Sequence, residues 1–157
     1  GHIVIVHNGE QCTCGRKGCW EAYASATGLI RLTRDAAIRN PESAVNRLAG
    51  GDLSRIDAKT SFDAMREGDA TGKMVVETYI RYLADGLANI INIFQPAKVV
   101  IGGGICKEGE TLLKPLREIV RKSTYYGEGN VPQTRIVTAE LGNDAGIVGA
   151  AMLGLQK

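Results

Sequence analysis

Three cysteines share one short loop in this chain, Cys12-Thr13-Cys14-Gly15-Arg16-Lys17-Gly18-Cys19. Structural zinc takes four ligands in a tetrahedron and favours thiolates. Gly15 and Gly18 stand where such a loop must turn, and glycine adopts positive φ at little cost. The segment therefore predicts a zinc loop whose three thiolates need one further ligand.

The fourth ligand has two candidates upstream, His2 and His7. A hairpin that turns at Asn8-Gly9 can bring either ring back to the loop. The residues alone leave that choice open. Beyond the loop lies Glu21, in the first turn of an expected helix, where the helix dipole favours a carboxylate. Helix-end electrostatics alone is a sufficient explanation for this glutamate.

Composition narrows the class of protein. The chain has 157 residues, of which 44% are hydrophobic and 23% charged, as in an ordinary globular domain with a core. A net charge of +2 and an aromatic content of 5% disfavour a nucleic-acid partner. No apolar run approaches the roughly 20 residues of a membrane span, and no signal peptide is visible. We expect a cytoplasmic protein with reduced cysteines and no membrane contact.

Periodicity of apolar residues predicts an alternation of helices and strands. The β-branched run Ile3–Val6 predicts a strand. A helix is expected from about Trp20 to Asn40, with a break near Gly28, and a longer one from Lys73 to Phe94, with Asp69 as its N-cap. The remaining expected elements are a short helix at 60–66, strands at 98–101 and 135–138, a helix at 109–122, and a closely packed final helix at 145–155 capped by Asp144. This order predicts an α/β fold with at least one parallel crossover.

A glycine turn, Gly102-Gly103-Gly104, follows the expected strand at 98–101. Such a turn lets the backbone approach a phosphate or nucleobase closely. It lacks the third glycine of the dinucleotide fingerprint, and Glu110 stands where a P-loop requires lysine. A tight strand-to-helix turn without a ligand explains it equally well.

Together these motifs resemble a known family. Three parts of this chain resemble the second signature of that family: Gly1-His2, Gly9 and Cys12-x-Cys14-Gly15-x-x-Gly18-Cys19-x-Glu21. The family is ROK (repressors, open reading frames and sugar kinases). Its later segments resemble Val99–Ile105 and Leu141–Gly146, in the same order, so the resemblance spans essentially the whole chain.

The resemblance implies an actin-like ATPase (ribonuclease H-like) fold, in which two α/β lobes close over sugar and ATP. Residues 1–157 would form the carboxy-terminal lobe, with a zinc loop over residues 2–21 and a nucleotide-side α/β segment over residues 73–157. The family's amino-terminal lobe, with its phosphate motifs and catalytic aspartate, would lie outside this chain. No catalytic residue is therefore expected in it.

The resemblance also implies roles for individual residues. Structural zinc would be held by His2, Cys12, Cys14 and Cys19, which favours His2 over His7. The sugar would be contacted by His2 and Glu21. The adenosine of ATP, bound with Mg²⁺, would lie beside Gly102, Gly103 and Gly104.

The function that this implies is ATP-dependent phosphorylation of a hexose, glucose to glucose 6-phosphate first among them, in a longer and commonly dimeric protein. A ROK repressor's sugar-sensing domain is the alternative, because such repressors keep the zinc loop. A third hypothesis is a zinc-stabilised fragment that binds nothing by itself.

Overall fold

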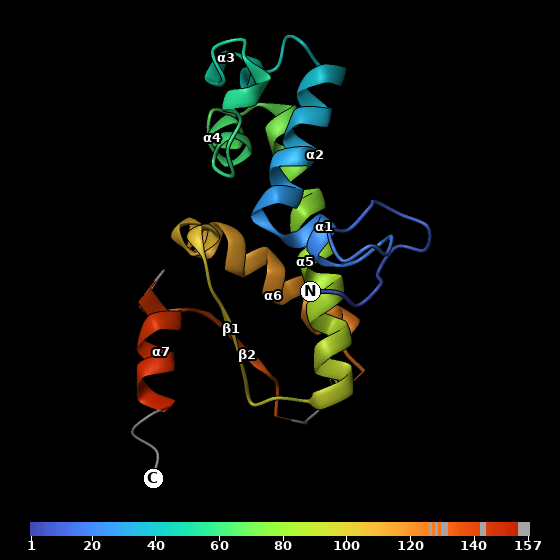
Figure 1. Ribbon diagram of the computed structural model, residues 1–157, viewed down its shortest axis with the longest axis vertical. Helices are drawn as coiled ribbons and strands as arrows, with labels where there is room; N and C mark the ends of the chain where they lie inside the picture. Colours follow the sequence, from blue (N-terminus) through green and yellow to red (C-terminus); the bar gives the residue numbers. More distant parts are fainter. Residues whose placement is uncertain (126, 128, 130–131, 142–143, 154–157) are drawn as a thin grey trace.

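The computed structural model describes residues 1–125, 127, 129, 132–141 and 144–153. Figure 1 shows a body organised around one long helix, α5. The elements in chain order are α1 (Glu21–Ala24), α2 (Ala26–Arg39), α3 (Ala44–Leu48), η1 (Leu53–Arg55), α4 (Thr60–Arg66), α5 (Ala70–Phe94), β1 (Lys98–Ile101), η2 (Gly104–Glu108), α6 (Glu110–Ser123), β2 (Arg135–Thr138) and α7 (Ala145–Leu153).

Helix α5 begins at Ala70, earlier than the expected Lys73, but the expected N-cap is confirmed, because the Asp69 side chain accepts a hydrogen bond from the backbone N–H of Gly72. The buried side chains of α5 meet those of α2, α4, α6 and β2 in one core, which includes Leu29, Phe62, Val76, Tyr79, Leu112, Leu116 and Ile136. The expected apolar face of α5 is confirmed except at its end, where Phe94 is exposed. The same core receives Trp20 from the end of the amino-terminal loop and Val99 and Ile101 from β1, so the loop and both strands pack around α5.

The two strands of the described sheet, β1 and β2, are parallel and joined through α6. Lys98 pairs with Arg135, and the register continues to Ile101 opposite Thr138. The expected α/β fold with a parallel crossover is confirmed. Both strands and α4 have the bounds that the sequence predicts.

The strand expected at Ile3–Val6 is wrong. Its backbone bends at Ile3, Ile5 and Val6 and makes only an isolated antiparallel bridge, between Val4 and Cys19. The Gly18 carbonyl accepts hydrogen bonds from the N–H groups of both Ile5 and Val6, so no ladder continues along this segment. The β-branched run serves instead as one side of the cysteine loop.

The first long helix breaks at Ser25 and not near Gly28. Ser25 has extended backbone (φ −86°, ψ 170°), and its side chain accepts a hydrogen bond from the Gly28 N–H at 3.1 Å. A serine that caps α2 therefore separates it from α1. Gly28 lies inside α2, where a Cβ would come within 2.8 Å of the Ala22 carbonyl oxygen.

Helix α7 does not pack closely, contrary to expectation. Ile147 is 73% exposed and Leu153 is 72% exposed. Figure 1 shows α7 apart from α5, at the other side of the two strands. The expected extension of this helix to residue 155 lies outside the described residues, and the capping role of Asp144 stays a prediction. Among the described helices, none has the length and apolar character to cross a membrane.

Candidate metal centre

Four side chains converge at the amino-terminal loop. The Cys12 Sγ lies 3.6 Å from the His2 Nδ1, and the Cys14 Sγ lies 3.5 Å from the Cys19 Sγ. All four donor atoms lie within 4.8 Å of one another. Zinc–sulfur bonds of about 2.3 Å place tetrahedral ligand atoms about 3.8 Å apart, so this set of three thiols and one imidazole fits a zinc ion.

The loop backbone explains how the cysteines meet. The Gly15 N–H donates to the Cys12 carbonyl at 3.0 Å, and the Cys12 N–H donates to the Arg16 carbonyl at 2.8 Å. Gly18 has φ +77°, and a Cβ there would lie 1.7 Å from the Val6 carbonyl oxygen. Glycine is therefore required at this turn by both conformation and space.

The thiols differ in acidity. The Arg16 backbone N–H hydrogen-bonds to the Cys14 thiolate and, against some desolvation, lowers the pKa of that thiol. Burial, followed by the hydrogen bond with Cys14, raises the pKa of Cys19. Because a metal binds thiolates, metal binding at this loop must release protons. Of these two thiols, Cys19 costs more free energy to ionise than Cys14.

His7 does not join this group. Its Nε2 lies 3.1 Å from the Asn8 side-chain nitrogen, and among the described residues the candidate metal ligands include His2 alone of the two histidines. The other ring nitrogen of His2, Nε2, lies 3.9 Å from the Glu21 Oε2. One imidazole thus connects the cysteine cluster to a carboxylate.

Glu21 occupies the place that the sequence assigns to it, in the first turn of α1. Its backbone N–H donates to the Gly1 carbonyl at 2.8 Å, and its Oε1 accepts a hydrogen bond from the Thr13 hydroxyl at 3.5 Å. A cavity of about 230 Å³ adjoins it, lined by Glu10, Gln11, Cys12, Thr13, Glu21, Ala22, Ser25, Thr27, Gly28 and Arg31. The carboxylate remains half exposed and able to accept hydrogen bonds from a ligand.

Trp20 anchors the loop to α5. Its indole N–H donates to the Tyr82 carbonyl at 2.9 Å, and its ring covers Gly86, where a Cβ would lie 2.0 Å from the indole. The Tyr23 hydroxyl accepts a hydrogen bond from the Glu10 N–H at 2.6 Å on the other side of the loop. Sequence reasoning missed this anchor, although a lone glycine inside a helical pattern is a recognised sign of close packing.

The glycine turn follows β1 as expected. Gly103 has φ +87°, and a Cβ at Gly102, Gly103 or Gly104 would meet no atom within 4 Å. Gly104 lines a cavity of about 250 Å³ together with Ala26, Asp57, Ala58, Lys59, Ile105, Lys107 and Glu108. Conformation requires glycine only at Gly103, and open space in front of the turn leaves room for a ligand.

A family comparison adds to this geometry. The model of the ROK family matches residues 1–157. The chain belongs to the ROK family. A glucokinase from Thermotoga maritima is 42% identical over 153 residues, which cover 98% of this ROK chain and 47% of that protein. The chain thus spans about half the length of the curated relatives it matches.

Repressors in the ROK family are more distant from this chain. A xylose repressor from Bacillus spizizenii is 26% identical over 156 residues, which cover 99% of this chain and 36% of the repressor. Both branches of the family therefore contain this portion, and the kinases are the more similar.

Solved ROK structures agree with the fold. A Streptomyces griseus glucokinase in complex with glucose and AMPPNP superposes with a TM-score of 0.87 at 36% identity, covering 100% of this chain and 51% of that one. A ROK transcriptional regulator, a homologue of the E. coli MLC protein, gives a TM-score of 0.68 at 27% identity, covering 88% of this chain and 33% of that one. The actin-like α/β fold expected from the resemblance is confirmed.

Proposed function

We propose that this chain is the carboxy-terminal part of an ATP-dependent hexose kinase that converts glucose to glucose 6-phosphate. The observation that carries the proposal is the His2 ring, which lies against Cys12 through one nitrogen and faces Glu21 through the other. The relatives support the same activity, since glucokinase similarity reaches 42% identity and repressor similarity 26%.

The metal loop has a structural role in this proposal. His2, Cys12, Cys14 and Cys19 would hold Zn²⁺, whose contribution is to cross-link the loop. With the loop fixed, His2 and Glu21 are presented together toward a sugar, and Glu21 accepts hydrogen bonds from its hydroxyl groups. Orienting ligand contacts in this way is typical of side chains next to a metal site.

The nucleotide would bind on the glycine side. Gly102, Gly103 and Gly104 would lie beside the adenosine of ATP, bound with Mg²⁺. The group that takes the proton from the sugar hydroxyl is expected in the family's amino-terminal lobe, so residues 1–157 bind and orient but supply no catalytic base. Phosphoryl transfer depends mainly on positioning and charge neutralisation, which both halves would share.

The assembled protein would act in the cytoplasm as a homodimer, with sugar and ATP as its ligands and without nucleic acid or membrane as partners. A sugar-sensing domain of a ROK repressor is the second candidate, because a repressor also matches 99% of this chain.

A coupled assay with ATP and glucose on the full-length protein tests the proposal. Turnover of glucose with stoichiometric zinc supports the kinase. Sugar-dependent release of operator DNA without turnover would instead assign the repressor function.

A further inference from the structure

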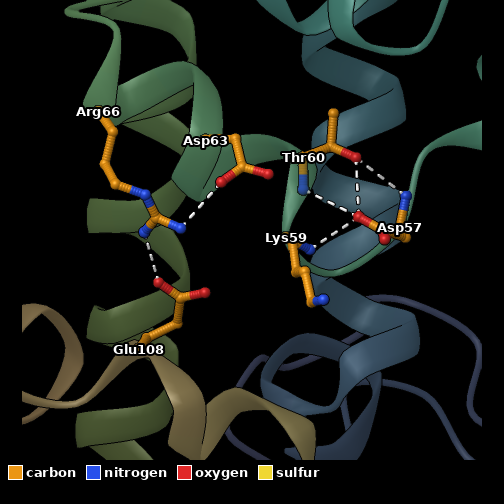
Figure 2. Close-up of polar contacts among 6 residues, drawn as sticks. All are labelled: Asp57, Lys59, Thr60, Asp63, Arg66 and Glu108. Atoms are coloured by element: carbon orange, nitrogen blue, oxygen red, sulfur yellow. Dashed lines mark hydrogen bonds and ion pairs between the residues drawn. The ribbon is translucent and has the colours of Figure 1, made fainter.

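A second polar cluster lies away from the metal loop, between α4 and η2. Figure 2 shows the Arg66 guanidinium between two carboxylates, those of Asp63 and Glu108. Arg66 Nη1 lies 2.7 Å from Glu108 Oε2, and Arg66 Nη2 lies 2.8 Å from Asp63 Oδ1. Asp63 shares α4 with Arg66, whereas Glu108 ends η2, the turn that follows the glycines.

Glu108 is an unusually enclosed carboxylate for this chain. Its side chain is 7% exposed, and burial raises the pKa of Glu108 despite the opposing charge of Arg66. A buried carboxylate costs free energy unless it is paired, and a shifted pKa at a cleft is a common mark of a functional site.

Glu108 also lines the cavity of about 250 Å³ beside Gly104. One wall of that cavity is the segment 57–59, and the other is η2. The first wall is stiff, because Asp57 Oδ1 accepts hydrogen bonds from the backbone N–H of Lys59 and from the Thr60 N–H and hydroxyl, at 2.9 to 3.0 Å (Figure 2). α4 continues directly from this wall and carries Arg66.

The Arg66–Glu108 ion pair therefore ties together the two elements that face each other across the cavity. Arg66 does not line the cavity itself. In the lining, Lys59 and Lys107 are balanced by two carboxylates, those of Asp57 and Glu108. Apolar surface from Ala26, Ala58 and Ile105 suits a flat, uncharged base with polar groups at its edge.

We propose that Arg66 is a positioning residue that acts through Glu108: by holding η2 against α4 it fixes the cavity beside Gly104 that receives the nucleoside part of ATP. This inference rests on the proposed kinase function. It assigns to a residue of the helical region a role in nucleotide affinity that none of the sequence motifs indicates.

The test is steady-state kinetics of the full-length protein with Arg66→Met, Arg66→Lys and Glu108→Gln. Arg66→Met removes the charge and keeps a long side chain, and we expect the KM for ATP to rise about five-fold with the KM for glucose unchanged. Glu108→Gln should act in the same direction. Arg66→Lys should restore part of the affinity, since an ammonium retains the charge but lacks the forked geometry.

Arg47→Met is the matched control, because Arg47 pairs with Glu67 on the same helical region and does not line the cavity. It should leave both KM values unchanged. A uniform fall in kcat with a lowered melting temperature, or an unchanged KM for ATP in both Arg66→Met and Glu108→Gln, would overturn the positioning role.

Calorimetric titration of ADP separates this inference from the proposed function. If the wild type does not phosphorylate glucose, the kinase proposal fails, while weaker ADP binding by Arg66→Met than by the wild type still supports the positioning role. Equal ADP affinity, or no ADP binding by either protein, would overturn it.

Discussion

At the scale of single residues, several side chains in this ROK chain serve two neighbours at once. His2 faces Cys12 and Glu21 through different ring nitrogens. Asp69 caps α5 through the Gly72 N–H and also accepts hydrogen bonds from the Ser43 hydroxyl and the Ala44 N–H, at the start of α3. Changing such a residue should alter two elements together.

Glu21 allows sugar binding to be separated from metal binding. Glu21→Ala in the full-length protein should lower glucose affinity about ten-fold, because a charged hydrogen-bond acceptor is lost. The zinc content should stay unchanged, since the candidate ligand set does not include Glu21. Calorimetry with glucose and metal analysis of the same sample provide both measurements. Loss of zinc from this variant would show that Glu21 is a ligand instead.

Asp69 should contribute stability that depends on pH. Partial burial raises its pKa, but the hydrogen bonds from Gly72, Ala44 and Ser43 outweigh burial and hold the pKa below its usual range. A carboxyl whose folded pKa is depressed stabilises the fold above its unfolded pKa of about 3.9, and that contribution is lost as the pH falls through the folded value.

Asp69→Asn should therefore lower the free energy of unfolding by about 1 kcal/mol near neutral pH, and the deficit should shrink in acid. Urea denaturation at several pH values measures it. Asp85→Asn, at an exposed position of the same helix, is the control and should leave the free energy of unfolding unchanged at every pH. A deficit that is constant with pH would contradict the charge-dependent cap.

At the scale of elements, α5 is the part on which the metal loop depends. The Trp20 ring packs directly against Gly86, where a Cβ would lie 2.0 Å from the indole ring. Gly86→Ala should destabilise the chain by about 2 kcal/mol, although alanine is the better helix former. Gly149→Ala in α7 is the matched control, since nothing lies within 4 Å of its Cβ position, and it should be neutral or stabilising. Equal thermal denaturation of Gly86→Ala and wild type would contradict the anchoring role.

The cysteine loop has little regular structure of its own, with two isolated bridges in place of a ladder. Its order should therefore depend on metal, because metal-binding free energy is folding free energy in such a site. Chelation of zinc, or Cys14→Ser, should lower the melting temperature. Cys106→Ser is the control, since Cys106 lies outside the cluster and donates to the Ile101 carbonyl, as a serine can. An unchanged melting curve after complete zinc removal would contradict this expectation.

At the scale of the whole molecule, the two candidate ligand surfaces both belong to residues 1–157, whereas we propose that the catalytic base lies in the amino-terminal lobe of the family. The 157-residue chain should therefore bind zinc and show no glucose turnover in a coupled assay, in contrast to the full-length protein. Normal turnover by the chain alone would show that a base lies within it.

What the sequence determined by itself is local. The apolar periodicity of α5, the strands β1 and β2, and the cap at Asp69 could be predicted because each depends on neighbours within a few residues. The spacing of Cys12, Cys14 and Cys19 with their glycines was equally informative, because a metal loop is encoded in one short segment.

Only the tertiary structure decided which long-range partners meet. The Trp20 ring packs against Gly86, and Arg66 forms an ion pair with Glu108. The Ile3–Val6 segment has no strand partner and contacts the cysteine loop through one isolated bridge. The apolar sequence of α7 likewise predicts close packing, yet its large apolar side chains Ile147, Val148, Met152 and Leu153 are exposed. The periodicity of a sequence shows which face of a helix or strand is apolar. Whether a side chain on that element becomes buried or forms an ion pair depends on residues far away in the chain.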